Sequence, residues 1–272
     1  MKVAFGTVFF PQSKAYIDDF INSINNQSYH NFDLLVINDG IEPAYIKSIK
    51  NVINVDCIVK EINAGATISS NRIALFKLAK ELDYNLIILG DFDDCFEKYR
   101  LEKIVKNLEN NYTFYYHNLI NSVDYKSVFY HLPKITDNIN QILQCNYLGL
   151  SNTAIYIDNI DKDFFGTLDE IDTNVFDWYF YSRLLLEHKY GKRIEGNLTI
   201  YRQHDDNIIG TYNNEIDLKQ ELKVKLKHYE ILKKYSSVFA DLYDNYKNNN
   251  FVECSQGYKY EGYWWSNLHT GG

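Results

Sequence analysis

Apolar and polar positions follow two different rhythms along the first part of this chain. Short apolar runs of strand length alternate with segments in which apolar residues recur every three or four positions, as on one face of a helix. The predicted strands span residues 3–10, 32–38, 56–60 and 86–90, and the predicted helices span residues 15–25, 44–53 and 69–82. Strands that alternate with helices indicate an α/β domain with a mostly parallel central sheet flanked by helices.

Three of the predicted strands end at places where such a sheet binds ligands, outside the carboxyl ends of its strands, and two of them are followed by acidic residues. Pro11, Asp39 and Asp91 each come directly after a strand, and Asp93 and Asp94 add two more carboxylates to the last site. Like charges at the mouth of a buried strand are costly unless a cation offsets them. This cluster therefore predicts a divalent-metal site. The alternative is a solvated turn, because Asp is a common turn residue.

Charge and missing motifs restrict the ligand. Neither G-x-G-x-x-G nor G-x-x-x-x-G-K-[ST] is present, so a diphosphate would have to be met by a metal held on acidic side chains. The net charge of −8 argues against nucleic acid as a partner, since that binding depends on clustered Lys and Arg. Mg²⁺ or Mn²⁺ suits a site made only of oxygen ligands.

The cysteines and the hydropathy suggest a location. Cys57, Cys95, Cys145 and Cys254 lie far apart without metal-finger spacing, which favours a reducing compartment. No apolar stretch approaches the ~20 residues that span a bilayer, and the first residues lack the pattern of a signal peptide. We therefore expect a cytoplasmic protein, with attachment to the inner face of the membrane left open.

The second half of the chain has two further features. Residues 112–165 are rich in large aromatic side chains, which are typical of a sheet core, although aromatic faces also stack on sugars. From Leu218 to Leu242 apolar residues recur at helical spacing and predict one amphipathic helix. Lysines flank that stripe at positions 219, 223, 225, 227, 233 and 234, and an aromatic tail with Tyr258, Tyr260, Tyr263, Trp264 and Trp265 follows. The helix could contact an anionic membrane or pack on the domain.

Five segments, in this order, resemble the signature of family 2 glycosyltransferases of the GT-A fold, particularly their bacterial rhamnosyltransferase-like members. The segments are residues 32–40, 63–71, 91–101, 176–179 and 201–210. The resemblance covers residues 3 to about 212. It implies a GT-A domain over residues 1–215, with a nucleotide-binding half (1–110) and an acceptor-side half (111–215). Residues 216–272 then form a C-terminal helical extension.

The resemblance implies a nucleotide-diphospho-sugar donor and Mn²⁺ or Mg²⁺ as cofactor. Asp91 and Asp93 match the family's D-x-D motif, with Asp93 as direct metal ligand and Asp91 as contact to ribose or to a metal-bound water. Asp39 matches the carboxylate that binds the pyrimidine base, and the alternative is a plain Asp-Gly turn. The implied donor-binding residues are Thr7, Phe9, Pro11, Asp39, Asn71, Asp91, Phe92 and Arg202.

Inverting transfer also needs a base that takes the proton of the acceptor hydroxyl. Asp177 matches the family's base, and its apolar neighbours would raise its pKa by desolvation. The alternative is that Asp177 caps the helix that runs to about residue 188. The nearby acidic residues Asp169, Glu170 and Asp172 are weaker candidates. Asp94 either orients its neighbours or meets the acceptor, or it is only a turn or helix cap.

Three basic side chains have open roles. His204 is a candidate metal or diphosphate ligand, although a lone His is often structural. Arg202 could pair with phosphate or with the acidic cluster. Many relatives carry Arg-Asn in the helix after Gly65, whereas here Arg72 follows Asn71. The arginine is thus displaced by roughly 200° around the helix and is not expected to reach the base of the donor nucleotide. UDP and dTDP remain the first expected donor nucleotides.

Together these observations favour an inverting, metal-dependent hexosyl- or deoxyhexosyltransferase. The resemblance implies transfer from a nucleotide sugar to a glycan or lipid-linked glycan in bacterial surface-polysaccharide biosynthesis, such as lipopolysaccharide or capsule. A GT-A-like sugar nucleotidyltransferase is an alternative, but its Gly- and Arg-rich loop is missing. A catalytically silent sugar-binding or scaffold protein is another, which intact Asp91, Asp93 and Asp177 argue against. Whether the chain forms a homo-oligomer is left open.

Overall fold

The computed structural model describes residues 1–62, 65–161, 163–168, 171, 173–202, 218–254 and 262–271. The strands are β1 (Val3–Phe9), β2 (Asp33–Asn38), β3 (Cys57–Glu61), β4 (Leu86–Leu89), β5 (Cys95–Phe96), β6 (Phe114–Asn121), β7 (Ile135–Thr136), β8 (Thr153–Tyr156), β9 (Gly191–Tyr201), β10 (Val252–Glu253) and β11 (Leu268–His269). The helices are α1 (Ile17–Asn25), α2 (Pro43–Val52), α3 (Ile68–Glu81), α4 (Arg100–Lys106), α5 (Phe176–Leu186), α6 (Leu218–Leu232) and α7 (Ser237–Lys247), with short 3₁₀ turns between some of them.

The first half of the chain folds as its periodicity predicts. β1 pairs in parallel with β2 and β4, and β2 pairs in parallel with β3. The sheet continues in the order β3-β2-β1-β4-β8-β6-β9-β5, with β7 beside β9. β8 is antiparallel to both of its neighbours, so the second half of the sheet is mixed. The carboxyl ends of the parallel strands β1, β2 and β4 nevertheless meet at one edge, which is where the candidate site lies.

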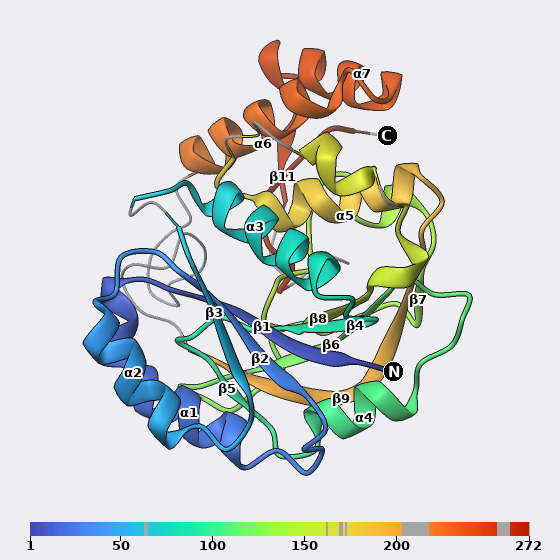
Figure 1. The fold of residues 1–272 in the computed structure, drawn as a ribbon. Coiled ribbons are helices and arrows are strands. Elements are labelled where there is room, and N and C mark those ends of the chain that lie inside the picture. Colours follow the sequence, from blue (N-terminus) through green and yellow to red (C-terminus); the bar gives the residue numbers. More distant parts are fainter. Residues whose placement is uncertain are drawn as a thin grey trace.

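Helices cover both faces of the sheet, as Figure 1 shows. One core is formed where α1, α2 and α4 pack on the face that carries Phe5 and Val36. The other lies on the opposite face, which carries Leu35 and Ile87 and is covered by α3 and α5, with α6 and α7 beyond them. These layers agree with the alternating inward and outward side chains of buried strands.

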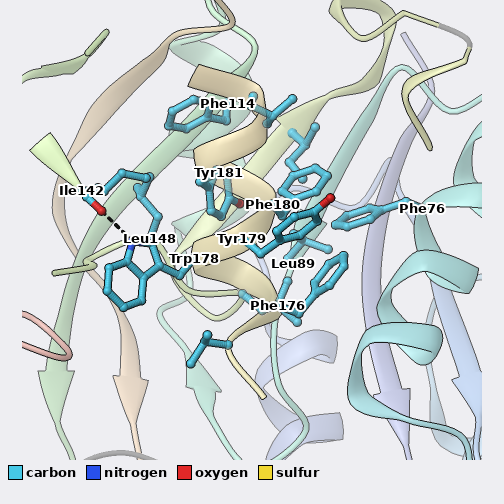
Figure 2. Packing of buried hydrophobic residues seen from close by; sticks show 14 of the residues in the cluster. Phe76, Leu89, Phe114, Ile142, Leu148, Phe176, Trp178, Tyr179, Phe180 and Tyr181 are labelled. Carbon is cyan, nitrogen blue, oxygen red and sulfur yellow. Dashed lines mark hydrogen bonds between the residues drawn. The ribbon is translucent and has the colours of Figure 1, made fainter. Parts of the chain in front are cut away.

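Helix α5 is apolar around most of its circumference because it lies between the sheet and the C-terminal helices. Its Phe180 stacks on Phe76 of α3 with ring centroids 4.7 Å apart. Figure 2 shows the indole of Trp178 on the other side of α5, where its N–H donates to the carbonyl of Ile142. Trp178 also stacks on His228 of α6 with ring centroids 4.1 Å apart, so aromatic packing joins the two helices.

The middle aromatic segment is mostly core, as expected. Phe114, Tyr115, Tyr116 and Phe129 are buried, whereas Tyr130 is 56% exposed. All four cysteines are free thiols. Within the described ranges, no helix combines the length and the apolar character needed to cross a bilayer.

The C-terminal extension differs from the predicted single amphipathic helix. Two helices, α6 and α7, replace it, and α6 packs on the α/β domain with a largely polar inner side. Lys225, expected beside the apolar stripe, is buried and pairs with buried Glu221 at 3.2 Å. Glu221 also accepts from the backbone N–H groups of Asn267 (3.1 Å) and Leu268 (2.9 Å). A buried ion pair thus fixes the last described segment of the chain against α6.

Candidate active site

The donor side of the site is organised around Asp39, at the end of β2. Its carboxylate is buried and accepts the backbone N–H of Gly65 at 2.7 Å and the side-chain amide of Asn71 at 2.8 Å. Each carboxylate oxygen has two acceptor positions, so the group can still accept an N–H from a ligand. Asp39 is therefore more than the residue of a turn: α3 and the loop before it hold the carboxylate in place.

Three of the predicted donor-binding residues, at and just after the end of β1, differ in burial and packing. Thr7 is buried, and its hydroxyl has no hydrogen-bond partner among the described residues. Phe9 packs into the core against Phe20, with ring centroids 5.6 Å apart. Pro11 is exposed and begins a 3₁₀ turn. Phe92, also predicted to contact the donor, packs edge-on against Phe10 at 4.6 Å. Phe9 and Phe92 thus pack against neighbouring rings behind the surface that would meet the donor.

The acidic cluster forms a tight turn between β4 and β5. The backbone N–H of Asp94 donates to the carbonyl of Asp91 at 3.3 Å, and the backbone N–H of Asp91 donates to the hydroxyl of Ser151 at 2.8 Å. Gly90 precedes the turn, and a Cβ there would lie 2.4 Å from the ring of Phe96. The glycine is required because the rings of Phe96 and Phe5 fill the space beside it.

Asp94 caps no helix, because the strand β5 follows it. Its buried carboxylate accepts the backbone N–H of Arg202 at 2.8 Å, and its second oxygen has no hydrogen-bond partner in the described part of the chain. Burial and the nearby charges of Asp93 and Asp91 raise its pKa well above the usual range. Asp94 therefore orients the end of β9, which agrees with the first of its expected roles.

A buried arginine lies beneath this turn. Arg100, the first residue of α4, is fully buried and donates to the carbonyls of Leu89 and Ser151. Its Nε donates to Nε2 of His117 at 3.0 Å, so the Nδ1 of His117 carries the proton and donates to the carbonyl of Asn118 at 2.8 Å. Burial lowers the pKa of Arg100 to about 9, which still leaves it charged at neutral pH.

Arg72 connects the acidic cluster with the predicted base. It projects from α3, with Nη2 lying 3.4 Å from Asp91 and Nη1 lying 3.2 Å from Asp177. Its side chain is only 18% exposed, so these ion pairs are partly shielded from water. The shifted arginine therefore reaches the centre of the site, where sequence comparison alone gave it no role.

Asp177 is the second residue of α5, and Val175 holds the N-cap position, so the helix-cap alternative is wrong. Burial raises the pKa of its carboxyl group, while Arg72 opposes this rise. A carboxylate of raised pKa is a stronger base than an ordinary one, which suits the acceptance of a proton. Its side chain keeps 27% of its surface exposed, which leaves an oxygen accessible to a ligand.

Asp91 and Asp177 face one cavity of about 110 Å³. Its other wall comes from the segment 146–151 and from Tyr201, Trp264 and Trp265. Trp264 is held by a backbone bridge to Asn146, with N–H to O distances of 2.8 and 2.9 Å. The C-terminal tail thus covers the cavity with aromatic rings, which are the side chains that stack on sugars.

Other predicted residues lie at the edge of this arrangement or beyond the described ranges. The guanidinium of Arg202 pairs with Asp19 of α1 at 2.7 Å, and it lies over the ring of Tyr16 at 5.0 Å. The remaining residues of this kind lie outside the described residues: Asn63, Ala64, Asp169, Glu170, Asp172, Gln203, His204, Asn207, Gly210, Tyr258 and Tyr260.

Sequence reasoning gave no individual role at the site to three residues that the structure places there. Ser151 and Arg100 hold the acidic turn, and Trp264 covers the cavity. A buried Arg has no local signature, since one charged residue at a helix start resembles a surface residue. The order Gly149-Leu150-Ser151-Asn152 after an apolar stretch was the available signal for the Ser151 loop.

With the geometry established, similarity to known proteins decides the family. The sequence profile described as Glycosyl transferase family 2 matches residues 8–176, which include Asp39, Asp91 and Asp93. This chain belongs to glycosyltransferase family 2. It is therefore a glycosyltransferase. No curated protein matches the sequence.

Solved structures show that this glycosyltransferase has the GT-A fold. It is similar to S. aureus TarS residues 1–349 in complex with UDP-GlcNAc, with a TM-score of 0.62 and 13% identity, covering 92% of this chain and 73% of that one. The mannosyltransferase PcManGT from Pyrobaculum calidifontis, in complex with GDP-Man and Mn²⁺, gives a TM-score of 0.58 at 7% identity, covering 89% and 68%. At these identities the likeness shows the fold alone.

Proposed function

We propose that this glycosyltransferase transfers a hexosyl or deoxyhexosyl group, with inversion, from UDP- or dTDP-sugar to a glycan or lipid-linked glycan acceptor. The single observation that supports this best is the common cavity of Asp91 and Asp177. The cavity is lined both by Asp91, which is suited to a metal ion at the donor diphosphate, and by Asp177, which is suited to deprotonate an acceptor. We further propose that the reaction belongs to bacterial surface-polysaccharide assembly at the inner face of the membrane.

In the proposed reaction the acceptor oxygen attacks the anomeric carbon on the face opposite the diphosphate. A new carbon–oxygen bond forms, and the bond between the anomeric carbon and the diphosphate oxygen breaks, with its electron pair leaving on the diphosphate. The acceptor proton moves to the carboxylate of Asp177. Asp39 accepts the imide N–H of the pyrimidine, which both uracil and thymine present, and thereby orients the donor.

Asp91 and Asp93 would hold the divalent ion, and the site fits such an ion. No group of three His, Cys, Asp or Glu side chains with ligand geometry occurs in the described part of the chain. Mg²⁺ and Mn²⁺ at phosphate sites need only one or two protein carboxylates, because phosphate oxygens and waters complete the shell. When bound, the ion acts as a Lewis acid that stabilises the leaving diphosphate. His204 remains a proposed further ligand.

The metal proposal predicts metal-dependent nucleotide binding. UDP or dTDP at about 100 times its Kd should stabilise the protein by roughly 2.7 kcal/mol in the presence of Mn²⁺. For a chain of this size that corresponds to a Tm increase of about 2–4 °C for each kcal/mol. Thermal-shift measurements with and without Mn²⁺, followed by donor hydrolysis assays, check this. Equal Tm values with and without the ion, for every nucleotide tested, would contradict the proposal.

Arg72 predicts a specific pH dependence. The kcat/KM of the wild type should fall at acidic pH as Asp177 becomes protonated, because only the carboxylate form accepts the proton. Arg72 lowers the pKa of Asp177, so Arg72→Gln should move this acidic limb to higher pH. Arg72→Lys, which keeps the charge, is the control. A limb that stays in place, or moves to lower pH, would show that Arg72 does not tune Asp177.

A further inference from the structure

A second pocket lies against the C-terminal helix α6 and is lined by three lysines. Its volume is about 440 Å³, within the range of small-ligand sites. Lys219, Lys223 and Lys227 are spaced four residues apart, so they project from one face of α6. Val175 and Val224 add apolar surface, and no acidic residue is among those described that line it. In a chain of net charge −8, such a local gathering of lysines favours an anion.

The pocket has fixed walls. On one side, Ser69 of α3 accepts the backbone N–H of Thr173 at 3.3 Å and donates to its carbonyl at 3.0 Å, which holds the segment 173–175. On the other side, the buried pair of Glu221 and Lys225 anchors α6. Lys225 lies about 200° around the helix from Lys223 and Lys227, so anchoring and pocket lining use opposite faces of α6.

The pocket adjoins the candidate active site. Asn174 and Val175 line both this pocket and the cavity that contains Asp91 and Asp177. Val175 directly precedes α5, and Asp177 is the second residue of that helix. A ligand that spans both cavities would therefore pass over Asn174 and Val175. The lysines lie on the side of the predicted base, whereas the residues that bind the donor nucleotide surround Asp39.

We propose that this pocket binds a phosphate group carried by the acceptor. Lysine ammonium groups bind phosphate as point charges, and several of them suit the charge of a diphosphate or of successive phosphodiesters. The acceptor's phosphate would rest on the lysine face while its sugar hydroxyl reaches Asp177. A lipid diphosphate or a phosphodiester-linked glycan could supply that group. The inference rests on the proposed function for the position of the acceptor hydroxyl.

The test is direct binding, measured without donor or turnover. Inorganic phosphate, citronellyl diphosphate and glycerophosphoglycerol are titrated into the full chain, and ³¹P NMR follows each probe. The variant is Lys223→Glu with Lys227→Glu, which reverses two exposed charges of the pocket. The matched control is Lys47→Glu with Lys50→Glu, two exposed lysines of α2 on the other side of the sheet. Thermal unfolding verifies that both variants fold.

We expect the wild type and the α2 control to bind at least one probe, with affinity lowered at least tenfold in the α6 variant. Tighter binding of citronellyl diphosphate would identify a lipid diphosphate as the source of the bound phosphate group. Tighter binding of glycerophosphoglycerol would identify a phosphodiester-linked glycan as that source. Equal affinities in the two variants, or no binding of any probe to the wild type, would overturn the proposal. Metal-dependent nucleotide binding is measured separately, so failure of the donor proposal is distinguishable from failure of this one.

Discussion

Asp177→Asn is expected to lower the rate of sugar transfer by about 10²–10⁴-fold, the usual contribution of a positioned general base. Asparagine has nearly the same shape but cannot take the acceptor proton. The substitution should leave nucleotide binding intact, because Asp39 and its partners Gly65 and Asn71 are untouched. Steady-state kinetics for transfer and thermal shift for nucleotide binding separate the two effects.

The matched control for this substitution is Asp241→Asn, at an exposed position of α7. It makes the same chemical change away from the cavity and should leave transfer unchanged. A wild-type rate in Asp177→Asn would remove Asp177 as the base. Loss of both transfer and nucleotide binding in that variant would instead indicate that the ion pair with Arg72 supports the donor side.

The elements of the first 90 residues could be predicted closely because their strands are continuous apolar runs. β2 and β4 are buried on both faces, so β4 and the four central positions of β2 are apolar, and the run itself marks the strand. The helices between them bury one stripe and show the expected period. Boundaries differ by one or two residues where a local turn intervenes, as where the 3₁₀ turn at Pro11 delays the start of α1.

Helix α6 could not be predicted in the same way, because its inner face is polar. Glu221, Lys225 and His228 are buried, whereas Leu222 and Leu226 are only partly covered. Helical periodicity predicts that polar residues face the solvent. In α6 the polar residues Glu221 and Lys225 face the interior instead, where an ion pair and hydrogen bonds to the tail stabilise them. The partners in the tail, Asn267 and Leu268, are 46 and 47 residues away from Glu221 in sequence, so no local pattern reveals them.

The site was predictable only as separate segments. The order of motifs identified Asp39, Asp91 and Asp177, but not which of them face the same cavity. Arg72 illustrates the reason: its position on α3 seemed displaced, yet the side chain is long enough to reach Asp91 and Asp177 from there. Contacts of this kind depend on the packing of α3 against α5, which is tertiary information.

Arg100→Leu is expected to lower the free energy of unfolding by about 3 kcal/mol and to reduce transfer. The leucine would remove the Arg100 donor from the carbonyl of Leu89 and from the Nε2 of His117. The carbonyl of Ser151 would lose one of its two donors and keep the hydroxyl of Thr199. Each buried polar group left unsatisfied costs roughly 1–3 kcal/mol, and part of this is recovered by relaxation. Urea unfolding measures the loss.

Activity should fall with stability in this variant, because Arg100 joins the end of β4 to the Ser151 loop directly beneath the acidic turn. Its charge also lies near Asp91 and Asp94, whose repulsion it offsets. Lys98→Leu is the matched control, since it removes one positive charge at an exposed position and should change stability by less than about 0.5 kcal/mol.

Arg100→Lys keeps the test informative if the leucine variant does not fold. Lysine retains the charge but not the planar fork that donates to several groups at once. We expect an intermediate loss of stability and a lower kcat, because the Asp91 turn is then held less rigidly. A leucine variant as stable and as active as the Lys98→Leu control would show that the buried arginine neither supports the fold nor positions the acidic turn.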